Sequence, residues 1–236
     1  MQTTDFAINP TLRPEVIYLG QERTPLLIID DFVSDITALR QQAQQSAFNP
    51  DHTAYYPGLK APLPKHYVAA TLTTLYPLIY DVYQVPKQLR LKPQNLFFAL
   101  INQTEDTLQP LQCLPHFDTA DGHYFAFLHY LNPQPHGSTG FFRHNPTGYE
   151  RISEQRRQHY FNAAQHFIDQ HGNPAQQYFV QSDAHFELYH QVPYQANRLI
   201  IYPGNLLHST LVNTSTDIDS SPISGRLTAN IFTSFL

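Results

Sequence analysis

The sequence predicts a mainly β fold with flanking helices. Short segments rich in Phe, Tyr and Leu follow one another from residue 95 onward, separated by turn residues such as Asn132-Pro133. Two helical patterns precede them, and a third interrupts them. At 236 residues the chain can form one domain with a full core. We therefore expect a single domain over 1–236, with an N-terminal strand and covering helices over 25–94 and a jelly-roll core over 95–236.

The N-terminal part begins with a short apolar run. Residues 26–29 (LLII) lie between Pro25 and Asp30, a pattern typical of a buried strand. Ser34 is the expected N-cap of a helix whose apolar residues recur from 36 to 47, and Asn49-Pro50 is expected to end it.

The next part contains a second helix. Residues 50–64 are rich in Pro, Tyr and Gly and predict a surface excursion. A helical pattern then covers 66–83, and we expect Pro77 to break or restart it.

Eight strands in two antiparallel sheets are expected in the core. They are Leu96–Asn102, Leu111–Asp118, His123–Leu131, Thr139–His144, Phe186–Val192, Arg198–Tyr202, His208–Asn213 and Arg226–Phe235. An insertion over about 145–183 carries an amphipathic helix, 153–171, with Gly172 as its C-terminal stop. Its length suggests a lid or a substrate-selecting wall rather than core.

Composition excludes several classes of partner and site. The formal net charge of −5 and pI near 6.2 give no basic field for nucleic acid or a membrane surface. The single cysteine, Cys113, excludes an intramolecular disulfide and a Cys-rich metal site. No apolar run approaches the length of a membrane span, and the start lacks the features of a secretory leader. We expect a cytoplasmic protein.

The motif His116-Phe117-Asp118 suggests a metal site. Residues two apart on a strand project to the same face, and His208 follows a neighbouring strand and a turn. Two imidazoles and one carboxylate are the ligand set that holds Fe(II) on one face and leaves the opposite face open. The alternative is that these are surface or hydrogen-bonded core residues.

The last predicted strand carries an unusual polar face. Arg226, Thr228 and Asn230 share one face, and apolar residues share the other. If the polar face points into the barrel, a buried arginine needs an anion to compensate its charge. Otherwise the strand is half exposed with its polar side in water.

These segments carry a family resemblance. HFD at 116–118, HYFAFLHYLN, RLIIYPGNLLHST and RLTANIF together resemble the double-stranded β-helix core of the Fe(II)/2-oxoglutarate dioxygenases. The layout is nearest to the prolyl-hydroxylase-like branch, although that branch usually has lysine at the arginine position. GSTGFFRHNPTGYE resembles a bacterial group within the superfamily.

The resemblance implies an oxygenase. His116, Asp118 and His208 would be the catalytic metal ligands, and Arg226 with Thr228 would bind the far carboxylate of the cosubstrate 2-oxoglutarate. With Fe(II) and O2 the enzyme would hydroxylate a C–H bond of a small-molecule or amino-acid-like substrate. Candidates for the substrate wall, each equally explained as structural, are Asn102, Tyr130, Arg143, His144 and Tyr149.

Two other functions remain open from the sequence. A cupin-like or zinc-dependent enzyme also uses two histidines and one carboxylate, but it gives Arg226 no role. A non-catalytic jelly-roll module would bind a ligand through the same cavity.

Overall fold

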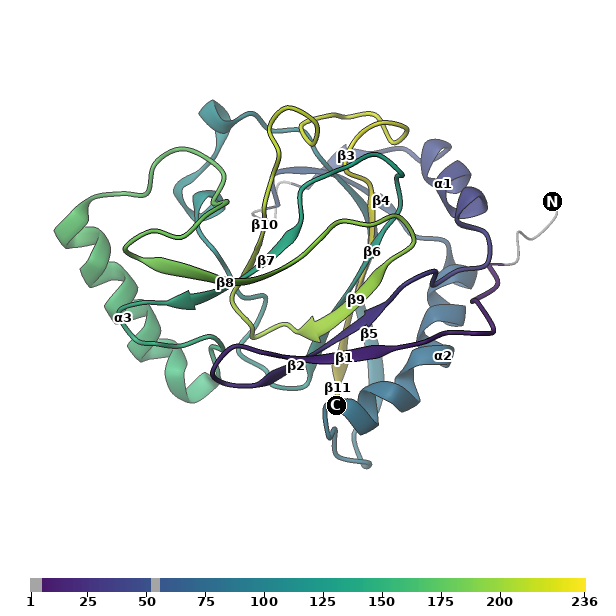
Figure 1. Ribbon diagram of the computed structural model, residues 1–236, viewed down its shortest axis with the longest axis horizontal. Helices are drawn as coiled ribbons and strands as arrows, with labels where there is room; N and C mark the ends of the chain where they lie inside the picture. The colour runs from purple at the N-terminus through teal and green to yellow at the C-terminus, as the bar shows by residue number, and fades with distance from the viewer. Residues whose placement is uncertain (1–5, 52–55) are drawn as a thin grey trace.

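The computed structural model describes residues 6–51 and 56–236, and its core is two antiparallel sheets packed face to face. Figure 1 shows the layers: helices α1 and α2 cover one side of the larger sheet, the smaller sheet lies on its other side, and α3 lies beyond the smaller sheet. The helices are α1 (Ile36–Gln44), α2 (Lys65–Val82) and α3 (Glu154–His171), with short 3-10 turns η1 (Glu105–Thr107) and η2 (Pro110–Cys113).

The larger sheet has eight strands in the order β1-β2-β9-β6-β11-β5-β4-β3, and the smaller has the order β10-β7-β8. The larger sheet comprises β1 (Glu15–Leu19), β2 (Thr24–Ile29), β3 (Asn49–Pro50), β4 (Gly58–Pro62), β5 (Leu91–Ile101), β6 (Tyr124–Tyr130), β9 (Leu199–Pro203) and β11 (Thr228–Phe235). The smaller sheet comprises β7 (Thr139–His144), β8 (Phe186–Val192) and β10 (His208–Thr210). From β5 onward the chain passes back and forth between the sheets, which confirms the predicted jelly-roll, or double-stranded β-helix, core.

The alternation of side chains along β11 separates two cores. Ala229, Ile231 and Phe235 belong to the apolar cluster that packs under the N-terminal helices. The opposite face of β11, which carries Thr228 and Asn230, points into the space between the sheets. The final strand is therefore buried on both sides, and its polar face lies inside the barrel.

One predicted core strand is wrong. Most of 111–118 forms no strand: Pro110 opens the 3-10 turn η2, and His116 alone makes an isolated bridge to His208. Proline presets the φ angle of a turn's first residue, and the side chain of Gln112 bonds back to the Gln109 N–H. These local bonds compete with extended pairing.

The first helix differs at both ends from the prediction. Asp35, not Ser34, is the N-cap, because its carboxylate accepts the Thr37 N–H at 2.8 Å. The helix ends at Gln44, and Asn49-Pro50 then forms the short strand β3.

The predicted surface excursion over 50–64 is wrong in its second half. Residues 58–62 form β4, which pairs with β5, whereas 52–55 lie outside the described residues. Pairing with β5, whose residues lie about forty positions further along the chain, overrides the turn-rich composition of this segment.

Pro77 does not interrupt the second helix. It lies on the exposed side of α2, where the carbonyl group that loses its partner can be hydrated. Leu72, Leu75 and Ile79 on the opposite side are buried against the sheet and hold the helix continuous.

The predicted helix of the insertion is present as α3, but its apolar face is only partly covered. Tyr160 is its buried residue, whereas Phe161 is 49% exposed. Gly172 ends it at φ +88°, a backbone angle that favours glycine. Among the described residues, no helix has both the length and the apolar composition needed to cross a membrane.

A buried carboxylate fastens the N-terminal hairpin to the smaller sheet. Glu150 is fully buried and accepts the backbone N–H groups of Gln21 and Glu22 at 2.9 and 3.0 Å. It also accepts two bonds from the Arg143 guanidinium, at 3.0 and 2.6 Å. Gly20 is required beside it, because a Cβ there would lie 2.2 Å from the Glu150 carboxylate.

We expect Glu150→Ala to lower the free energy of unfolding by about 1 to 3 kcal/mol, because the Gln21 and Glu22 N–H groups lose their acceptor and Arg143 keeps only its second carboxylate partner, Glu187. Urea unfolding followed by circular dichroism measures this. The control is Glu154→Ala, which removes an exposed pair with Arg157 and should cost less than about 1 kcal/mol. Equal losses in the two variants would contradict the structural role of Glu150.

Candidate metal centre

Backbone pairing positions the three candidate ligands. The His116 N–H donates to the His208 carbonyl at 2.9 Å, and the His208 N–H donates back to the His116 carbonyl at 2.8 Å. Two residues on, the Asp118 N–H donates to the Gly204 carbonyl at 2.7 Å. The loop that carries HFD is thus fixed against the turn between β9 and β10, although it is not itself a strand.

The structure brings the three side chains together. One nitrogen or oxygen atom from each of His116, Asp118 and His208 lies within 4.8 Å of the others. The two imidazole rings are 4.5 Å apart between centroids, and Nε2 of His208 lies 3.9 Å from Oδ1 of Asp118. A single cation between these atoms would contact all three after small side-chain rotations.

The hydrogen bond of His208 selects its tautomer. Its Nδ1 lies 2.8 Å from the Leu206 carbonyl, which can only accept, so Nδ1 carries the proton. The Nε2 atom then presents a lone pair toward Asp118. In metalloproteins, a hydrogen bond of this kind at the other ring nitrogen orients a histidine ligand.

The protonation states suit a cation site. Desolvation lowers the pKa of His208 to about 4. His116 is accessible to solvent, but the protein atoms around its ring, with His208, lower its pKa to about 4 as well. Asp118 is likewise accessible to solvent, but the protein atoms around its carboxyl group raise its pKa to about 6. At pH 7 the site holds two neutral imidazoles and a carboxylate that a nearby cation would stabilise.

The neighbours of the HFD loop keep this cluster open. Phe117 points away from it and packs against Tyr160 and Phe161 of α3, with ring centroids 5.8 and 6.0 Å apart. Gly204 faces Asp118, and a Cβ there would lie 2.5 Å from the Tyr124 ring and 3.2 Å from the Asp118 carboxylate. Glycine at this turn therefore leaves room for both side chains.

Arg226 lies inside the barrel, 2% exposed. Its Nε donates to the Gly137 carbonyl at 2.8 Å, and its guanidinium stands 5.6 and 5.5 Å from the ring centres of Tyr130 and Tyr194. Its Nη2 atom is buried without a hydrogen-bond partner among the described residues. A buried donor of this kind on a charged group calls for an anion.

The last strand was expected to begin at Arg226, but β11 begins at Thr228, so Arg226 lies just before it. Thr228, like Arg226, is buried. Its hydroxyl accepts a bond from the Asn230 side chain at 2.9 Å, so its own proton remains available for another acceptor.

Tyr202 of β9 lies near both the candidate metal ligands and Arg226. Its ring meets the His208 ring edge-on at 4.9 Å between centroids. Burial and the negative charge of Asp118 raise its pKa well above the usual value, and the positive charge of Arg226 opposes that shift. Tyr202 was not among the site residues predicted from the sequence, although alternation along the apolar strand RLIIYP places it on the inward face.

The candidate substrate-wall residues have structural partners. Tyr130 lies beneath Arg226, Arg143 pairs with Glu150 and Glu187, and buried His144 contacts Thr147 and His185. The hydroxyl of Tyr149 bonds to the His159 ring, and the Asn102 N–H donates to the Pro57 carbonyl. The single cysteine, Cys113, is buried.

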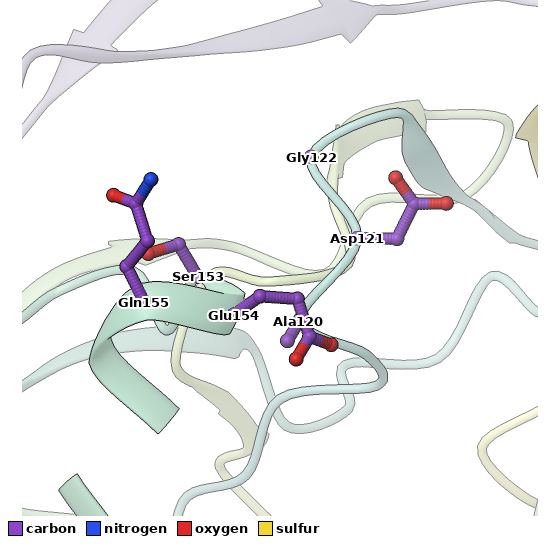
Figure 2. Close-up of a pocket in the computed structure, with 6 residues that line it drawn as sticks. All are labelled: Ala120, Asp121, Gly122, Ser153, Glu154 and Gln155. Carbon is purple, nitrogen blue, oxygen red and sulfur yellow. The ribbon is translucent and has the colours of Figure 1, made fainter. Parts of the chain in front are cut away.

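A surface pocket of about 410 Å³ borders the loop that follows Asp118. It lies between residues 120–122 and the first turn of α3 (Figure 2). Figure 2 shows the Glu154 side chain reaching toward Ala120 and the Asp121 side chain pointing away from the helix. None of its lining residues belongs to the HFD motif or to the Arg226 face.

Comparison with solved structures finds similar folds at low identity. HygX from Streptomyces hygroscopicus, with nickel and 2-oxoglutarate bound, has a TM-score of 0.48 and 14% identity, over 92% of this chain and 87% of that one. AviO1 from Streptomyces viridochromogenes Tue57 has a TM-score of 0.45 and 10% identity, over 98% and 90%.

A third similar structure is the non-haem α-ketoglutarate-dependent epimerase SnoN from nogalamycin biosynthesis. Its TM-score is 0.44 and its identity 12%, over 90% of this chain and 78% of that one. With TM-scores below 0.5, these three likenesses say nothing about the reaction.

No curated protein matches the chain. A family model does match, over residues 10–233, which is nearly the whole sequence. The chain therefore belongs to DUF6445, a family of unknown function.

Proposed function

We propose that this protein is an Fe(II)/2-oxoglutarate-dependent oxygenase that hydroxylates a C–H bond of a small-molecule or amino-acid-like substrate. The observation that carries the proposal is the pairing of two features in one jelly-roll interior. One is an open cluster of two imidazoles and a carboxylate, and the other is a buried arginine with an unpartnered nitrogen.

His116, Asp118 and His208 would hold the iron. The donor set fits this ion, because it offers borderline nitrogen ligands and one anionic oxygen on one side. When bound, Fe(II) with 2-oxoglutarate and O2 supplies the oxidising chemistry. The protein's part is to keep both imidazoles neutral, hold Asp118 ionised beside the cation, and leave the far side open.

Arg226 and Thr228 would hold the far carboxylate of 2-oxoglutarate. Because Nε of Arg226 already donates to Gly137, the end of the guanidinium that carries Nη2 is the one that can face an anion. The Thr228 hydroxyl, which accepts from Asn230, can donate to the same carboxylate. The zinc-dependent alternative leaves this buried charge without a role.

The first prediction concerns the metal. Replacing His208 by Ala removes the one ligand whose tautomer is fixed, so stoichiometric Fe(II) or Mn(II) binding should be lost while the fold persists. Anaerobic calorimetric titration measures the binding, and thermal unfolding checks the fold. His166→Ala, an exposed histidine on α3, is the matched control. Unchanged metal affinity in His208→Ala would remove this site from consideration.

The second prediction concerns Arg226. Arg226→Ala should weaken 2-oxoglutarate binding by about 2 to 5 kcal/mol, because one partner of a buried charge pair is lost. Arg226→Lys should not restore it, since a single ammonium cannot reproduce the planar fork. Calorimetry with Mn(II)-loaded protein measures the binding, and Mn(II) affinity should stay at the wild-type value in both variants.

That experiment also tests the function as a whole. A wild-type protein that binds metal but not 2-oxoglutarate would favour a non-catalytic jelly-roll module or a zinc-dependent enzyme. If Arg226→Ala binds 2-oxoglutarate as tightly as wild type does, the arginine has a structural role only.

The third prediction concerns α3, which contacts the HFD motif through Phe117. Because little of this helix is buried, we expect its amide protons to exchange faster than those of β6 and β11. Addition of Mn(II) and 2-oxoglutarate should slow the exchange if the helix is a lid. Hydrogen exchange measured by mass spectrometry tests this. Protection equal to that of the strands in the ligand-free protein would make α3 a fixed structural helix.

A further inference from the structure

A buried acid and a buried histidine stand beside Arg226. The Asp217 carboxylate is fully buried and accepts the Asn213 N–H at 2.9 Å and the Gly137 N–H at 3.0 Å. It also lies 2.9 Å from Nδ1 of His136, whose side chain is 1% exposed. Burial raises the pKa of Asp217, but the bonds from His136 and the backbone, with the charge of Arg226, lower it below its usual value.

The contact with Asp217 fixes one nitrogen of His136. An ionised carboxylate only accepts, so Nδ1 of His136 carries a proton and donates it. The other nitrogen, Nε2, is buried and has no hydrogen-bond partner among the residues that the structure describes. Buried polar atoms are normally hydrogen-bonded, so Nε2 of His136 is an exception that the packing of the fold does not explain.

His136 and Arg226 are joined through one peptide unit. Gly137 follows His136 directly; its N–H donates to Asp217, and its carbonyl accepts Nε of Arg226. The His136 ring and the Arg226 guanidinium also both pack against Tyr194, at 4.9 and 5.5 Å. Two buried, unpartnered nitrogens, Nη2 of Arg226 and Nε2 of His136, therefore belong to one small assembly.

The charge balance of this assembly can accommodate one more positive charge when an anion is bound. Arg226 contributes one positive charge and Asp217 one negative charge, so the pair is neutral before an anion enters. A bound carboxylate adds a second negative charge in a desolvated place. A proton on Nε2 of His136 would restore balance and supply a second donor.

We propose that His136 is a second anion-binding residue of the Arg226 subsite, held by Asp217, and that carboxylate binding draws a proton from solvent onto its Nε2. This deepens the proposed function and rests on it in naming the anion as the far carboxylate of 2-oxoglutarate. Among the described residues, the charged and titratable groups near His136 are Asp217, Arg226 and Tyr194. Tyr56 and Tyr178 lie close enough to sense the charge of Asp217.

Calorimetry tests the proposal without any measurement of turnover. Mn(II)-loaded wild-type protein is titrated with 2-oxoglutarate at pH 7.5 in two buffers that differ in ionisation enthalpy, which gives the number of protons taken up. His136→Asn is the informative variant, because its amide nitrogen can replace Nδ1 toward Asp217 but nothing replaces Nε2. His166→Asn is the matched control on exposed α3.

We expect His136→Asn to bind 2-oxoglutarate roughly tenfold to a hundredfold more weakly, as the loss of a charge-assisted bond implies. Its proton uptake should fall below that of wild type, with Mn(II) affinity unchanged. His166→Asn should keep both the affinity and the uptake. The proposal would be overturned if His136→Asn bound 2-oxoglutarate with the affinity and the proton uptake of wild type. It would also be overturned if the variant bound more weakly but took up as many protons as wild type.

A second ligand separates this proposal from the proposed function. Glutarate carries the same far carboxylate but no keto group, so it reports on the subsite in metal-free protein. If 2-oxoglutarate fails to bind while glutarate binds with proton uptake that depends on His136, the oxygenase assignment fails and the anion subsite stands. If neither dicarboxylate binds wild type, both are overturned.

A folding defect in His136→Asn would not leave the question open. Histidine ring 15N resonances of the wild-type protein report on Nε2 directly. Addition of glutarate should move the His136 Nε2 signal to the protonated range. An Nε2 signal that stays in the unprotonated range at saturating ligand would overturn the proposal.

Discussion

The reciprocal backbone bonds between His116 and His208 are the contact on which the candidate centre depends. They join a loop after a 3-10 turn to the first residue of β10, two segments about ninety residues apart in sequence. An antiparallel pair of this kind places both side chains on the same side, and the Asp118 bond to Gly204 brings the carboxylate to them. The geometry of the cluster is therefore set by main-chain bonds, which depend little on which side chains surround it.

The interior of the barrel contains several buried polar and charged side chains. Almost complete burial is shared by Arg226, His136, Asp217 and Thr228. Desolvating such groups costs free energy that neutral packing would avoid, so their presence needs compensation. Backbone bonds to Asp217 and Gly137 compensate part of this cost, whereas Nη2 of Arg226 and Nε2 of His136 have no hydrogen-bond partner among the described residues.

The insertion between β7 and β8 is attached to the site at a few points. Phe117, which stands between His116 and Asp118 in the sequence, contacts Tyr160 of α3. Glu150 joins the segment before α3 to the N-terminal hairpin through hydrogen bonds. Its remaining surface is largely exposed, with Phe161 half open to solvent. Tyr160 of α3 nevertheless shares an apolar cluster with Phe142 of β7 and Phe186 of β8, so the helix is also joined to the smaller sheet.

The sequence by itself determined the β architecture, the helices and the residues of the candidate centre, because alternation along strands and the spacing of polar residues are local properties. It misjudged 111–118, where Pro110 and its neighbours close a turn by local bonds, and β4, whose partner is distant. It could not find the assembly of His136, Asp217 and Arg226. Those residues lie far apart along the chain, and only the closure of the two sheets decides that one peptide unit, at Gly137, connects them.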